Sequence, residues 1–92
     1  MQIDIDSLAL ELLAVCEERK FDRSWQEAGV YLHLESSEFI EALRGKGSSS
    51  PAEEAGDVIF VLFSMLAANG IQPSEAIRLL REKIENLPTV GI

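Results

Sequence analysis

Apolar side chains recur every three to four residues along most of the chain, which is the spacing of an amphipathic helix. This pattern predicts four helices and no strand, so the expected fold class is all-α, with a four-helix, bundle-like protomer. The first predicted helix covers about residues 7–19. Its apolar stripe comprises Ile5, Leu8, Leu12, Val15 and Cys16.

Capping residues mark where the second helix begins. Residues 24–27 (Ser-Trp-Gln-Glu) form a capping box, in which the Ser24 hydroxyl accepts a hydrogen bond from the Glu27 amide and the Glu27 carboxylate reaches back. The helix that follows is predicted to end at Arg44. Residues 45–50 (Gly-Lys-Gly-Ser-Ser-Ser) are a short polar connector.

Similar signals bound the last two helices. Residues 50–53 (Ser-Pro-Ala-Glu) are a second capping box, with proline at the favoured first helical position. This third helix is predicted to reach about Asn69, and Gly70 follows it as a C-terminal cap. Pro73 begins the fourth helix and Pro88 ends it. The apolar stripe of the fourth helix comprises Ile77, Leu80, Ile84 and Leu87.

The third helix is apolar on nearly every face between residues 58 and 68 (Val-Ile-Phe-Val-Leu-Phe-Ser-Met-Leu-Ala-Ala). Such a helix must be surrounded by other apolar groups. A four-helix chain of this length covers only one or two of its faces. We therefore expect a homo-oligomer, a dimer or a tetramer built as a dimer of dimers, whose interface uses this helix.

The composition limits the partners. The 92 residues make one small domain, residues 1–92, with 8 Lys+Arg against 16 Asp+Glu and a net charge of −8. This acidity disfavours nucleic acid polymers and anionic membranes as partners. Cys16 is the only cysteine, the first residues lack a basic signal region, and the apolar run is about half of the roughly 20 residues of a membrane span. We expect a cytoplasmic protein that does not bind membranes.

Two acidic pairs carry the candidate chemistry: Glu35 with Glu38, and Glu54 with Asp57. Members of an i, i+3 pair lie on one helix face. The short connector makes the two helices antiparallel neighbours. Glu38 lies roughly 9 Å before the end of its helix, and Asp57 roughly 9 Å after the start of the next. The four carboxylates are therefore predicted to meet in one layer.

Four carboxylates at one place repel each other and resist losing water, so a cation is needed to neutralise them. Hard oxygen donors favour Mg²⁺ or Mn²⁺. His33 lies near the side of the helix opposite Glu35, which argues against a di-iron site. The alternative is an ordinary solvated face. Gly56, Ser36 and Ser37 favour the metal site, since small residues inside the pairs permit close helix approach.

These residues resemble the MazG-like, all-α nucleoside triphosphate pyrophosphohydrolase superfamily. Its signature is Glu-x-x-Glu on one helix and Glu-x-x-Asp on the next, which residues 34–43 and 53–62 match. The resemblance covers about residues 25–86. It implies Mg²⁺-dependent hydrolysis of a nucleoside triphosphate between the α and β phosphates, giving monophosphate and pyrophosphate. It also implies that Glu38 accepts a proton from the attacking water and that the metal is held by Glu35, Glu38, Glu54 and Asp57.

The resemblance extends to phosphate contacts. Lys83 and Asn86 are similar to a lysine and an asparagine that members use near phosphates, although a surface ion pair is the alternative for Lys83. The basic residue that often follows this pair is absent. Arg44 and Lys46 flank the connector, where they either steer phosphates or complement the helix C-terminus.

Trp25, the only tryptophan, is a candidate substrate contact. Its indole either stacks on a nucleobase or packs against Leu8 or Ile84. No motif for a base pocket is present in the sequence, so the base and sugar of the nucleotide substrate stay open.

Two alternatives to nucleoside triphosphate hydrolysis also stay open. One is a pyrophosphohydrolase for a related substrate such as phosphoribosyl-ATP. The other is a non-catalytic helical module for protein–protein association. Leu34 supports the second alternative, since it stands where many members of the superfamily have an additional glutamate.

Overall fold

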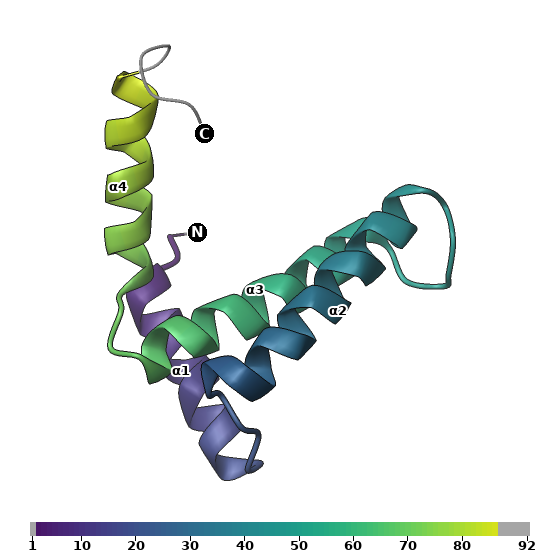
Figure 1. Cartoon of the computed structure of the whole chain (residues 1–92), viewed down its shortest axis with the longest axis horizontal. Coiled ribbons are helices and arrows are strands. Elements are labelled where there is room, and N and C mark those ends of the chain that lie inside the picture. Colours follow the sequence, from purple (N-terminus) through teal and green to yellow (C-terminus); the bar gives the residue numbers. More distant parts are fainter. Residues whose placement is uncertain (1, 87–92) are drawn as a thin grey trace.

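The computed structural model describes residues 2–86, which contain four helices and no strand. The prediction of an all-α, bundle-like fold is confirmed. The helices are α1 (Ile5–Glu18), α2 (Trp25–Leu43), α3 (Pro51–Ala68) and α4 (Pro73–Glu85). Figure 1 shows α2 and α3 side by side as a hairpin, with α1 packed across α3 and α4 directed away from α2. Leu87 and Pro88, assigned to the end of the fourth helix, lie outside the described residues.

The two predicted capping boxes differ in outcome. At α3, Ser50 accepts a hydrogen bond from the Glu53 amide at 3.1 Å, and the Glu53 carboxylate accepts one from the Ser50 amide at 3.4 Å. At α2 only half of the prediction is correct. Ser24 accepts from the Glu27 amide, but its own amide donates to Asp22 Oδ1 at 2.8 Å. The carboxylate of Asp22 lies two residues away and takes the bond that Glu27 was expected to accept.

Two aspartates at the start of α1 fix the ends of two helices. Asp4 accepts hydrogen bonds from two amides of the first turn, so α1 begins at Ile5, earlier than the predicted residue 7. Asp6 acts on α4 instead: its carboxylate accepts from the Ser74 amide at 2.9 Å and from the Ser74 hydroxyl at 2.6 Å. Gln72, the N-cap residue of α4, makes no capping bond of its own. The N-terminus of α4 is thus capped by a residue distant in sequence.

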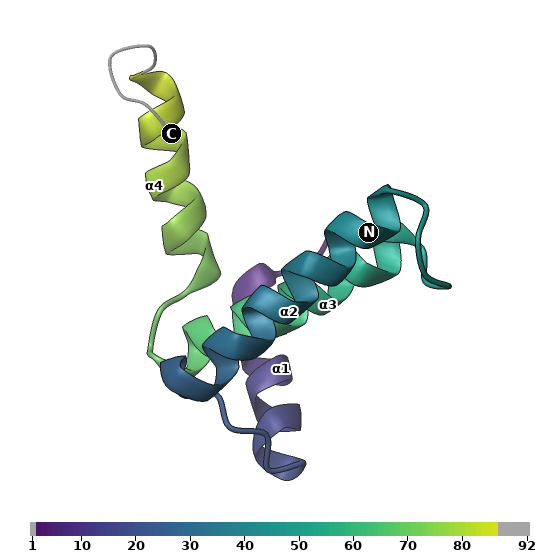
Figure 2. The same cartoon turned by 45° about the vertical axis from the view of Figure 1, so that its right-hand side comes forward.

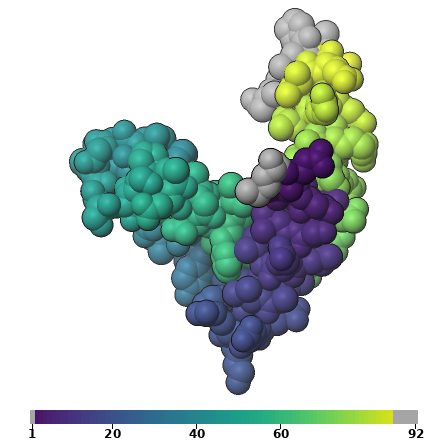
Figure 3. Space-filling view, turned by 180° about the vertical axis from the view of Figure 1, so that it is seen from behind, coloured from purple at the N-terminus to yellow at the C-terminus, as the bar shows by residue number. Residues whose placement is uncertain are grey.

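The turn between α3 and α4 bends the chain by 105°. Gly70 adopts φ 72°, a left-handed conformation that glycine takes at little cost, and Pro73 is buried at the start of α4. As a result α4 and the hairpin are two arms that diverge from α1 (Figures 2 and 3). No single helix among residues 2–86 is long and apolar enough to cross a membrane; by length and composition alone, α3 and α4 would do so only as this bent pair.

The core of one protomer is made of small side chains. The buried apolar residues are Ala9, Cys16, Ala28, Ala42 and Val61. The accessible surface is 6856 Å², against about 5,300 Å² for a compact monomer of this mass. The radius of gyration is 14.8 Å, against about 12 Å for a compact chain. Ile59 and Leu62 on α3 remain exposed, so one chain leaves part of this apolar helix uncovered.

Candidate metal centre

Three of the four candidate carboxylates meet where α2 faces α3. Glu35, Glu38 and Glu54 each offer one oxygen, and these oxygens all lie within 4.8 Å of one another. We call this group the carboxylate cluster. It forms because Glu35 and Glu38 share a helix face and the connector turns α3 back along α2. None of the three forms an ion pair with a basic side chain of residues 2–86.

Two oxygens of the cluster are buried without a partner. Glu35 Oε2 and Glu54 Oε2 accept no hydrogen bond from any described residue. Burial, and then the negative charges of Glu38 and Asp57, raise the pKa of the Glu35 carboxyl. Buried, like-charged acceptors without donors destabilise the fold unless a cation or a proton neutralises them. The all-oxygen donor set fits a hard divalent cation.

Asp57 lies beside the carboxylate cluster but outside the group of mutually close oxygens. Its charge acts on Glu35, and both residues line the same cavity. An aspartate side chain is one methylene shorter than a glutamate, so its carboxylate extends less far between the helices. The prediction that Gly56 permits close helix approach is wrong: it is exposed, and a Cβ built there would meet no atom within 4 Å.

Two cavities of different character adjoin the carboxylate cluster. The first, of about 450 Å³, is bounded at one end by Glu35 and Asp57. Its aromatic walls are Phe21, Tyr31 and Phe60. The second cavity, of about 440 Å³, is bounded by Glu38 and Glu54. Its other walls are mostly polar: Ser37, Glu41, Ala42, Lys46, Gly47, Ser48 and Ser49. The cluster therefore lies between a cavity with three aromatic and six charged lining residues, which we call the aromatic cavity, and a mostly polar one.

A comparison with protein families matches residues 16–84, which is 69 of the 92 residues, to phosphoribosyl-ATP pyrophosphohydrolase. The chain belongs to this family. The family is part of the same all-α, MazG-like pyrophosphohydrolase superfamily that the two motifs resemble. Neither a curated protein nor a solved structure matches the chain significantly. Membership indicates a pyrophosphohydrolase that acts on a nucleotide, and the matched residues include the whole carboxylate cluster and Asp57.

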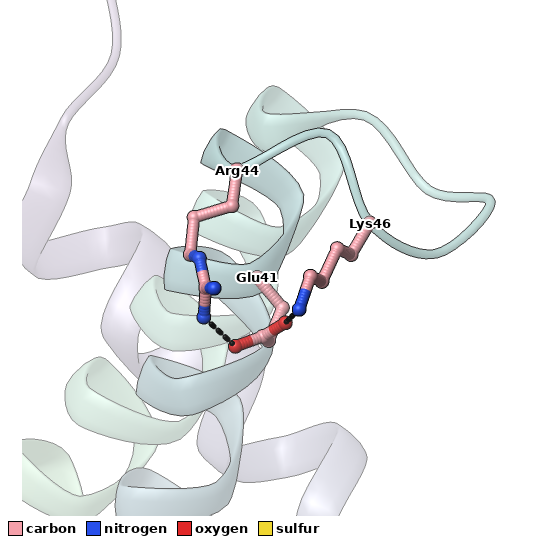
Figure 4. A network of polar contacts seen from close by, with 3 residues as sticks. All are labelled: Glu41, Arg44 and Lys46. Atoms are coloured by element: carbon pink, nitrogen blue, oxygen red, sulfur yellow. Dashed lines mark hydrogen bonds and ion pairs between the residues drawn. The ribbon is translucent and has the colours of Figure 1, made fainter.

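An ionic network of Glu41, Arg44 and Lys46 lies beside the polar cavity. Glu41 binds Arg44 at 3.0 Å and Lys46 at 4.0 Å (Figure 4). Lys46 lines the cavity, whereas Arg44 does not. Of the two basic residues that flank the connector, only Lys46 is therefore placed to contact a ligand beside the cluster.

Three further candidate residues lie away from the carboxylate cluster within one protomer. Trp25 is 69% exposed and lines neither cavity. Lys83 and Asn86 belong to the C-terminal end of α4, the arm that diverges from the hairpin (Figure 1). The Asn86 side-chain amide donates to the Glu82 carbonyl at 2.7 Å. One chain does not bring Lys83 or Asn86 to the cluster.

Other residues of the aromatic cavity were not singled out from the sequence. Lys20 and Arg23 lie on the loop before α2, and Phe21 and Tyr31 contribute aromatic walls. Their sequence signal is the run Lys-Phe-Asp-Arg directly before a helix N-cap. This run has no periodicity, and its role becomes visible only once the loop packs against α3.

Proposed function

We propose that this protein hydrolyses phosphoribosyl-ATP between its α and β phosphates, giving phosphoribosyl-AMP and pyrophosphate. The observation that carries the proposal is the position of the carboxylate cluster between two unlike cavities. The aromatic cavity suits the nucleoside half of the substrate, because bases stack on aromatic rings. The polar cavity, with Lys46 and the serines of the connector, suits the pyrophosphate half. The family match supports phosphoribosyl-ATP over an ordinary nucleoside triphosphate.

The proposed metal ligands are Glu35, Glu38, Glu54 and Asp57. Mg²⁺ or Mn²⁺ bound there would neutralise phosphate charge and lower the pKa of a bound water. Glu38 is the exposed member of the cluster and borders the polar cavity, so its carboxylate is the one accessible to water. Glu38 would take a proton from the water whose oxygen bonds to the α-phosphorus, and the bond from that phosphorus to the bridging oxygen would break. Pyrophosphate would leave toward Lys46.

The proposal includes a homo-oligomer, a dimer or a tetramer. The chain has about 1,500 Å² more accessible surface than a compact chain of its mass, or about 3,000 Å² for two copies, which is within the total area that obligate dimers bury. A second copy covering α3 and α4 would remove this surface from water. It would also allow Lys83 and Asn86 of one subunit to approach the other subunit's substrate phosphates.

The test is product analysis with the purified protein. Phosphoribosyl-ATP and a panel of ribo- and deoxyribonucleoside triphosphates are incubated with Mg²⁺, and products are separated by anion exchange. We expect phosphoribosyl-AMP and pyrophosphate from the parent and from a Glu53→Gln control, since Glu53 lies outside the cluster and lines neither cavity. The Glu38→Gln variant should lose about 10²- to 10⁴-fold in turnover, the usual contribution of a general base.

Other outcomes separate the alternatives. Faster hydrolysis of an ordinary triphosphate would transfer the proposal to that substrate. Diphosphate and orthophosphate as products would contradict cleavage at the α–β bridge. No turnover, together with a melting temperature that Mg²⁺ leaves unchanged, would indicate a non-catalytic helical interaction module.

A further inference from the structure

The aromatic cavity ends in two basic residues that the proposed hydrolysis does not use. Ser64 lies seven residues after Asp57 on α3, about 10 Å along the helix axis. Arg23 Nη1 donates to Ser64 Oγ at 3.5 Å, which places the guanidinium at this level. Lys20 lines the same cavity. The Arg23 guanidinium therefore lies about two helical turns from Asp57, while the α3 residues that line the cavity end at Val61.

The Arg23 guanidinium is held by one hydrogen bond to Ser64, and not all of its N–H donors have a partner. Its Nε is buried without a hydrogen-bond partner, and its central carbon lies 6.0 Å from the centre of the Phe21 ring. Neither Arg23 nor Lys20 forms an ion pair with a carboxylate of residues 2–86. Asp22 and Glu27 also line the cavity, but Asp22 accepts a hydrogen bond from the Ser24 amide at 2.8 Å. Glu27 adds a negative charge to this side of the cavity and the buried Nε faces no solvent, so the donors left for an anionic ligand are Arg23 Nη2 and the Lys20 ammonium.

Lys20 occupies a backbone position that favours glycine. The C-terminal ends of α1, α2 and α3 have the same pair of closing hydrogen bonds. At α1, Lys20 N donates to Glu17 O and Phe21 N to Cys16 O. The equivalent donors are Gly45 N (to Ala42 O) and Lys46 N (to Glu41 O) at α2, and Gly70 N (to Ala67 O) and Ile71 N (to Leu66 O) at α3. Glycine has the left-handed conformation at two of these ends, with φ 77° and 72°. At the third end Lys20 adopts φ 60°. A lysine held in this strained conformation at a cavity wall points to a role for its ammonium group.

We propose that Lys20 and Arg23 bind a second phosphate group of the substrate, at the end of the aromatic cavity far from the carboxylate cluster. This inference rests on the proposed function. With the α-phosphate at the cluster, the base lies along Tyr31 and Phe60, and a phosphorylated ribose joined to that base extends to Lys20 and Arg23. The guanidinium offers a planar pair of donors and the ammonium a compact charge, which together suit a phosphate dianion. ATP has no phosphate at this position, so the subsite selects phosphoribosyl-ATP over ATP.

The test compares equilibrium binding of phosphoribosyl-AMP and AMP by calorimetry in the presence of Mg²⁺, where neither nucleotide is turned over because neither has an α–β bridge. The parent should bind phosphoribosyl-AMP more tightly than AMP. Lys20→Gly should weaken phosphoribosyl-AMP binding about tenfold or more and leave AMP binding unchanged, since only the former has the second phosphate. The melting temperature of Lys20→Gly should equal or exceed that of the parent because glycine relieves the left-handed backbone. Weakened binding is then not explained by unfolding.

Two further variants complete the design. Arg23→Leu should abolish the preference for phosphoribosyl-AMP, and Arg23→Lys, which keeps the charge, should restore part of it. Arg19→Ala removes a neighbouring charge that lines neither cavity and should leave the preference unchanged. Equal losses for both nucleotides in Lys20→Gly, or no loss, would overturn the subsite. A parent that hydrolyses phosphoribosyl-ATP but binds both monophosphates equally would overturn the subsite and leave the proposed function standing.

Discussion

In the α2–α3 hairpin, both helices are capped by serines next to them in sequence, and the facing side chains bring three carboxylates together within one chain. The α4 arm has the same kind of amphipathic pattern but is capped by Asp6 of α1. Its apolar residues Ile77, Leu80 and Ile84 remain about half exposed. The hairpin therefore forms its carboxylate cluster from adjacent helices, whereas α4 depends on α1 for its N-terminal cap.

The largest effect is expected in the hairpin, at Glu54. Glu54→Gln replaces a buried carboxylate oxygen of a proposed metal ligand. Losing a residue that only supports a metal ligand costs about 10- to 100-fold, so losing Glu54 itself should lower turnover by more than about 100-fold. The stabilisation of the protein by Mg²⁺, measured as a shift in melting temperature, should disappear as well.

Its neighbour provides a matched control. Glu53→Gln removes the same charge one residue earlier on α3, at the residue whose carboxylate belongs to the capping box. Glutamine also serves in capping boxes, so this variant should keep both the Mg²⁺ response and turnover. Equal losses in the two variants would mean that acidity in general, and not the cluster, binds the metal.

The next effect is expected on α4, at Leu80. We predict that Leu80→Lys weakens the homo-oligomer by about 10- to 100-fold in dissociation constant, because burying a leucine contributes about 1.5–3 kcal/mol. Sedimentation of the parent and the variant at micromolar concentration measures the change. Glu75→Gln alters the net charge equally on the opposite side of α4 and should leave the mass unchanged. A parent that sediments as a monomer would remove the role assigned to α4.

The difference between the two regions also explains what the sequence could predict. Helix positions and most caps follow from local patterns, and the depth of Glu35, Glu38 and Glu54 follows from helical rise, so the hairpin cluster was predictable. The place of Asp57 outside the cluster did not follow, because helical rise gives only the depth of each residue along its helix and says nothing of how far its carboxylate reaches. Lys20 and Arg23 were missed because their cavity exists only after the loop before α2 packs near Ser64.

A smaller effect is predicted for the capping of α4 by α1. Asp6→Ala removes the acceptor for the Ser74 amide and hydroxyl, so the free energy of unfolding should fall by about 1 kcal/mol, as for a lost N-cap. Hydrogen exchange should accelerate in the first turn of α4, while the Mg²⁺ response of the hairpin persists. Uniform acceleration across all four helices would show that α4 and the hairpin unfold as one unit.

The smallest effect concerns the stability of the metal-free hairpin, at Glu35. Because the pKa of Glu35 is raised on folding, the folded state binds its proton more tightly than the unfolded state does, so deprotonation at rising pH lowers the free energy of unfolding. Glu35→Gln removes the charge, and in EDTA at neutral pH it should be a few tenths of a kcal/mol more stable than the parent, the scale of one like-charge pair on a helix. The order should reverse in Mg²⁺, which stabilises only a protein that retains its ligands. A variant less stable than the parent in EDTA would mean that the buried oxygens of Glu35 are already satisfied, and that the hairpin holds no charge repulsion for a cation to relieve.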